Sequence, residues 1–77
     1  MKLSYAQAEV FEEFLGSDGW MTMLILLGER LEQKQNALKS GRLDHEEYLR
    51  TCAAIRELEY LRDEPQRLVR KSYVESR

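Results

Sequence analysis

The sequence has few of the residues that stabilise very small proteins through disulfides or bound metal ions. It contains one cysteine and one histidine among 77 residues. A single cysteine excludes a disulfide within the chain, and neither a Cys-x-x-Cys pair nor a Cys/His zinc pattern is present. Because both common supports are missing, we expect partner subunits to complete the burial of apolar surface. The lone thiol fits a reducing, intracellular environment.

Long hydrophobic runs are also missing. The longest apolar stretch, residues 20–27, is interrupted by Thr22 and is far shorter than the roughly 20 residues that span a bilayer. No apolar region follows Lys2, since Gln7 and Glu9 interrupt the segment where a signal peptide would have one. We therefore expect a soluble protein with no membrane partner.

Neither sign of charge dominates, because 12 basic residues face 14 acidic ones and the net charge is −2. This balance excludes the broad positive field of a general nucleic-acid coat protein. The four glycines form no phosphate-binding loop, since they follow no strand and match neither GxGxxG nor GxxxxGK. We expect no cofactor, and a protein partner rather than a nucleic acid.

At 77 residues the chain forms at most one small domain, residues 1–77, with a thin core. Chains of this size hide only about 60% of the surface that the unfolded form exposes. A single core below about 70–80 residues rarely supplies more than roughly 3–5 kcal/mol. A partner that covers further apolar surface would therefore add much to the stability.

The local signals predict an all-α protein. Ser4 with Gln7 three residues later is typical of a capping box, and Gly16 of a helix end, so a short helix is predicted over about residues 4–15. Ser17 or Asp18 can cap a second helix over about 18–40. Apolar residues surround the first half of that helix, whereas its second half is polar with one stripe.

The strongest helix start lies at Asp44, with Glu47 at the reciprocal position of a capping box. A helix over about 45–62 follows and forms a long antiparallel hairpin with the second helix. Pro65 removes a helical hydrogen bond and disfavours helical geometry at Glu64, so it ends or bends that helix. We predict a short, separate C-terminal helix over about 65–74.

No arrangement of residues resembles a catalytic or metal site. The only histidine, His45, and the only cysteine, Cys52, are about 10.5 Å apart along one helix and cannot form a hydrogen bond. The carboxylates fit solvated helix faces and first turns. We expect no enzyme activity, no catalytic residue and no metal ligand.

Excess apolar and aromatic surface is the informative feature of the chain. Aromatic and methionine side chains are enriched at the centres of protein interfaces. The alternative for Trp20 is burial within the chain beneath Phe11, Phe14 and Leu15. The candidate interface residues are Trp20, Met21, Met23, Ile25, Tyr60, Leu68 and Tyr73.

A small basic cluster near the C-terminus is the candidate phosphate contact. Arg67, Arg70 and Lys71 share one helix face. Cations are also favoured near a helix C-terminus, so a solvated helix end explains the same residues.

Several short segments occur in an order that resembles small helical proteins of tailed bacteriophages. They are the turn Phe14-Leu15-Gly16-Ser17-Asp18-Gly19-Trp20, the segment Glu46 to Arg50, Ile55-Arg56 and Glu64-Pro65. Phage proteins of this kind are commonly encoded among the head and packaging genes. The resemblance implies a virion or assembly component, found in the virion or in the host cytoplasm during assembly, and it carries over no catalytic residue.

The sequence therefore leads to one hypothesis and one alternative. The hypothesis is a multi-copy, non-enzymatic phage adaptor or cement protein, which binds itself or a portal, connector or capsid protein. The alternative is a small regulator or inhibitor that binds a host protein or, through the basic cluster, nucleic acid.

Overall fold

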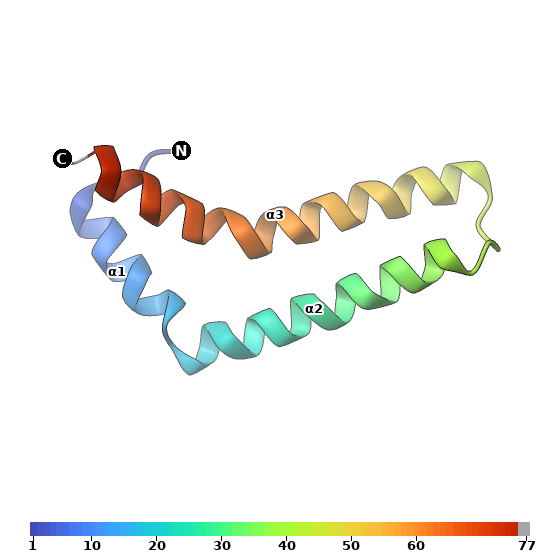
Figure 1. The fold of residues 1–77 in the computed structure, drawn as a ribbon, viewed down its shortest axis with the longest axis horizontal. Helices are drawn as coiled ribbons and strands as arrows, with labels where there is room; N and C mark the ends of the chain where they lie inside the picture. The colour runs from blue at the N-terminus through green and yellow to red at the C-terminus, as the bar shows by residue number, and fades with distance from the viewer. Residues whose placement is uncertain (76–77) are drawn as a thin grey trace.

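The computed structural model describes residues 1–75, and they form three helices and no strand. The helices are α1 (Tyr5–Leu15), α2 (Asp18–Lys39) and α3 (His45–Glu75). α2 and α3 lie side by side as a long antiparallel hairpin, and α1 closes its open end against both of them (Figure 1). The predicted all-α class is confirmed.

Each helix begins at the residue that its sequence predicts. At α1 the Ser4 hydroxyl accepts a hydrogen bond from the Gln7 amide at 3.1 Å, and the Gln7 side chain accepts one from the Ser4 amide at 3.0 Å. Ser17 caps α2 by accepting a hydrogen bond from the Trp20 amide. The Asp44 carboxylate accepts one from the Glu47 amide at 2.8 Å. These bonds satisfy backbone donors that have no partner within the helix.

The turn between α2 and α3 depends on one glycine. Ser40 ends α2, and Gly41 then adopts a positive φ of 68°. This left-handed conformation is costly for a residue with a Cβ and readily available to glycine. The hairpin turn therefore lies at Ser40 and Gly41, directly after α2.

The prediction of a separate C-terminal helix is wrong, because α3 continues without interruption from His45 to Glu75 with Pro65 inside it. Figure 1 shows α3 bending in its middle, orange portion. Proline within a helix removes one hydrogen bond and bends the axis, at a cost of about 3 kcal/mol. The buried side chains beyond it, Leu68 and Val69, offset this cost, since burial of each contributes about 1.5–3 kcal/mol.

The main core lies at the closed end of the hairpin. Leu3 and Ala8 pack with Leu68 and Val69 of α3. Phe11, Leu15 and Tyr73 are partly buried against this cluster. Along the hairpin itself, the buried hydrophobic residues are Trp20 and Leu31.

The molecule is flat and elongated, with extents of 49, 25 and 12 Å. Its radius of gyration is 16.0 Å, whereas a compact chain of this length would have one of about 11–12 Å. The three helices lie beside one another rather than stacked in depth (Figure 1). Both broad faces of the hairpin are therefore left uncovered by the chain itself.

Candidate protein-interaction surface

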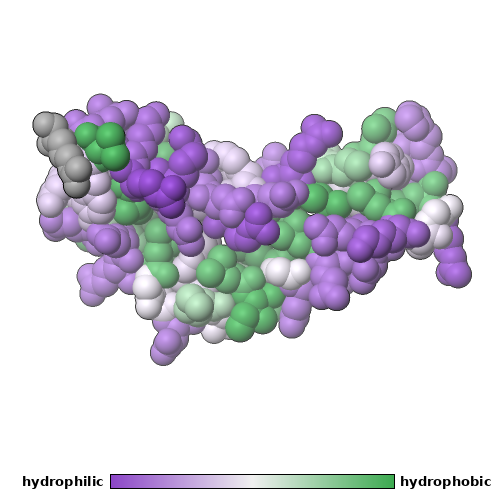
Figure 2. Space-filling view, viewed as in Figure 1, coloured by the Kyte–Doolittle hydropathy of each residue, from purple (hydrophilic) through white to green (hydrophobic). Residues whose placement is uncertain are grey.

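Apolar side chains gather on the outside of the first half of α2. Met21, Met23, Ile25 and Leu26 expose 54%, 48%, 63% and 55% of their area. Figure 2 shows a hydrophobic patch over this part of α2, bordered by hydrophilic residues. Contiguous exposed patches rimmed by polar residues are typical of protein-interaction sites.

These four residues divide into two flanks of α2. At 100° per residue, Met21 and Ile25 point within about 40° of each other, and Met23 and Leu26 within about 60°. The two pairs point about 150° apart, and the buried residue Leu31 faces the opposite side of the helix, about 100–110° from each pair. We call them the Met21 flank and the Met23 flank. The structure thus separates the predicted interface residues of α2 into two surfaces.

Trp20 lies inside the chain rather than on either flank. It is 6% exposed, and its ring lies 5.8 Å from that of Phe14, which in turn stacks on Phe11 at 6.0 Å. This is the burial beneath α1 that the sequence left open as an alternative. Its indole N–H has no acceptor among the described residues. Trp20 therefore supports the turn between α1 and α2.

Two other predicted interface residues take part in the contact between α1 and α3. Leu68 is 8% exposed and belongs to the core. The Tyr73 hydroxyl donates a hydrogen bond to the Glu12 carboxylate of α1, and its ring meets that of Tyr5 edge-on at 5.6 Å. These side chains fix the position of α1, whereas Tyr60, 56% exposed, stays on the surface.

An apolar groove of about 630 Å³ lies along α1 and the N-terminal segment. Val10 and Phe14, 69% and 46% exposed, lie on its wall. This groove is not predicted from the sequence, although the apolar residues of α1, with Val10 and Phe14 among them, form one wide face. The width of that face does indicate exposed apolar surface, since it is wider than a single neighbouring helix can cover. The groove is lined by Met1, Leu3, Ala6, Gln7, Val10, Phe11 and Phe14.

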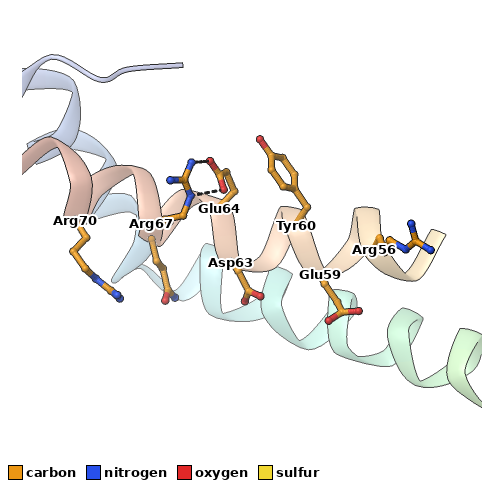
Figure 3. A pocket seen from close by; sticks show the side chains of 8 residues that line it. Arg56, Glu59, Tyr60, Asp63, Glu64, Arg67 and Arg70 are labelled. Carbon is orange, nitrogen blue, oxygen red and sulfur yellow. Dashed lines mark hydrogen bonds and ion pairs between the residues drawn. The ribbon is translucent and has the colours of Figure 1, made fainter. Parts of the chain in front are cut away.

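A second hollow, of about 560 Å³, lies along α3 and is charged rather than apolar (Figure 3). Its three arginines are matched by three acidic residues. Arg67 forms a two-pronged ion pair with Glu64, and this hydrogen bonding lowers the pKa of the Glu64 carboxyl. The lining residues are Arg56, Glu59, Tyr60, Asp63, Glu64, Gln66, Arg67 and Arg70.

Two of the three candidate phosphate contacts already lie next to acidic residues of the same chain. Arg67 is paired with Glu64, and the Lys71 ammonium lies 3.9 Å from the Glu75 carboxylate. Arg70 is exposed and faces the same balanced hollow. The structure therefore places acidic groups next to the cluster that would have to attract a phosphate.

Within residues 1–75, no group of three or more His, Cys, Asp or Glu side chains is placed to hold a metal ion. His45 and Cys52 lie on one helix, α3, as expected. None of the described helices is both long enough and apolar enough to cross a membrane.

Comparison with protein-family models, with curated proteins and with solved structures found no match to this chain.

Proposed function

We propose that this chain is a non-enzymatic interaction protein that acts as one component of a larger protein assembly. The observation that carries this proposal is the surface that the fold leaves open. The accessible area is 6064 Å², whereas a compact protein of 9.1 kDa exposes about 4,900 Å². Large apolar side chains are among the exposed residues, on the two flanks of α2 and in the groove along α1.

The resemblance to small helical phage proteins supports a virion as the assembly. In this proposal the chain is an adaptor or cement protein that binds a portal, connector or capsid protein. The Met23 flank and the apolar groove receive a helix or loop of that partner, the mode in which an apolar helix face fills a groove. The charged hairpin tip, where Arg50 pairs with Glu46 at 2.6 Å, would contribute to register and specificity.

The alternative, a regulator that binds nucleic acid, has less support in the geometry. Arg67 and Lys71 face carboxylates of their own chain, and the net charge is −2. Binding to a DNA duplex that falls steeply with salt, and is lost when Arg67, Arg70 and Lys71 are replaced by alanine, would favour this alternative.

The proposal is tested with particles assembled from the genome that encodes the chain. The purified particles should contain the protein in many copies. A Met23→Lys/Leu26→Lys double variant should remain helical, because both side chains are exposed, and its particle content should fall at least tenfold. Gln33→Lys/Gln35→Lys is the matched control on exposed polar positions of α2. Absence of the wild-type chain from the particles, or normal incorporation of the double variant, would contradict the proposal.

A further inference from the structure

The Met21 flank of α2 continues to a glycine. Gly28 follows Ile25 by three residues, so Met21, Ile25 and Gly28 all point within about 60° of one another. Met21 and Ile25 are more than half exposed, and Gly28 is exposed as well. Together they form an exposed, mostly apolar surface on the first half of α2, which is lowest at the glycine.

The fold of the single chain does not require a glycine at position 28. Gly28 lies in the interior of a 22-residue helix and does not have a positive φ. A Cβ added there would meet no atom within 4 Å apart from the adjoining backbone of its own helix. Glycine is less favourable than alanine inside a helix, so its presence calls for another reason. Close approach of a second backbone is a role that a residue without a side chain serves well.

The area that the whole elongated chain exposes beyond that of a compact protein is comparable with what one stable interface takes from a partner. The chain exposes about 1,200 Å² more than a compact protein of its mass. A standard protein interface takes about 800 Å² from each partner. One interface of ordinary size would therefore bring the exposed area close to that of a compact protein.

A second copy of the same chain fits this surface. The centre of the flank is apolar, and a twofold interface sets the same patch against itself, so no surface of opposite charge is required. A net charge of −2 per chain gives little repulsion between copies. We propose that two copies of this chain pack α2 against α2 through Met21, Ile25 and Gly28 and form a twofold dimer. This inference rests on the proposed function and names one partner within the assembly.

The dimer is tested by sedimentation equilibrium of the full chain over a range of concentrations. The wild-type mass should approach that of a dimer in the micromolar range. Ile25→Lys should raise the dissociation constant at least a hundredfold, whereas Leu26→Lys, on the Met23 flank, should change it less than threefold. A wild-type monomer at several hundred micromolar, an assembly of another size, or equal effects of the two lysine substitutions would overturn the proposal.

Gly28→Ala separates the dimer from the stability of the single chain. In dilute solution, where the chain is monomeric, alanine should raise the melting temperature by several degrees, because the site is open and helical. The same variant should weaken the dimer at least tenfold, since the added methyl group prevents close approach of the helices. A Gly28→Ala protein that dimerises as tightly as the wild type would overturn the role given to this residue.

The two proposals fail separately. A chain that is monomeric in solution but present in particles would overturn the dimer and leave the proposed function standing. A chain that dimerises through Ile25 but is absent from particles would overturn the proposed function and leave the dimer standing.

Discussion

Tyr73 joins the last helix to the first at a titratable contact. Its hydroxyl donates a hydrogen bond to the Glu12 carboxylate, and this bond, together with burial and the negative charges of Glu12 and Glu9, raises the pKa of Tyr73 to about 12. Ionisation would remove the donor and place two negative charges side by side. Since the pKa in the folded chain exceeds that in the unfolded chain, the contribution to stability is complete below about pH 10. It is lost as the pH rises from about 10 towards 12.

Spectrophotometric titration of the folded chain should therefore show a late phenol ionisation near pH 12. Tyr73→Phe should remove this late step, because the substitution removes the hydroxyl that donates to Glu12. Tyr60→Phe, at an exposed site, should leave the late step in place. A titration in which Tyr73→Phe and Tyr60→Phe lose the same step would show that the bond to Glu12 does not persist in solution.

The sequence predicts which residues share a face of a helix, but it does not predict which face another helix covers. Helical spacing alone places Trp20 beside Met23, one turn further along. The structure buries Trp20 and exposes Met23, because α1 packs against the start of α2 and places Phe14 against the indole ring. This packing depends on the angle of the turn between α1 and α2 and on contacts with α3. The local sequence of α2 specifies neither.

At the scale of the helices, the sequence predicts where each helix starts, but it does not predict that α3 continues through Pro65. Each start depends on hydrogen bonds between residues three positions apart, as at Ser4 and Asp44, so a short segment contains the whole signal. Pro65 is a local signal too, and it predicts a break. The continuation of α3 depends instead on packing of Leu68 and Val69 against α1, more than fifty residues earlier in the chain. A local cost of about 3 kcal/mol is smaller than the combined burial of two such side chains.

Leu68→Ala should therefore destabilise the protein strongly, although Leu68 follows the proline. Truncation of a buried leucine costs about 2–5 kcal/mol, which approaches the whole stability that a core of this size supplies. Thermal unfolding followed by circular dichroism should show a large fall in the melting temperature or a loss of the cooperative transition. Leu61→Ala is the matched control, since Leu61 lies one turn before Pro65 and is 53% exposed. Equal effects of the two substitutions would contradict the packing of α3 beyond Pro65.

At the scale of the whole molecule, burial is concentrated at one end. Leu3, Ala8, Leu68 and Val69 form the core where α1 meets α3, whereas no residue between 32 and 67 is buried. The hairpin arm therefore depends on Leu31 and on half-buried contacts such as Ile55. An interface on the first half of α2 would extend the stabilised region from the closed end towards the middle of the hairpin.

This uneven burial predicts that the protein opens from the hairpin tip. Local opening requires less free energy where few apolar contacts are lost. In hydrogen exchange followed by mass spectrometry, peptides within residues 34–52 should therefore exchange at least tenfold faster than those within 64–75, after correction for intrinsic rates. The comparison is made on Gly28→Ala in dilute solution, so that self-association does not protect α2. Uniform protection along the chain would mean that the thin hairpin arm and the core unfold as one unit, and would contradict a core confined to the closed end.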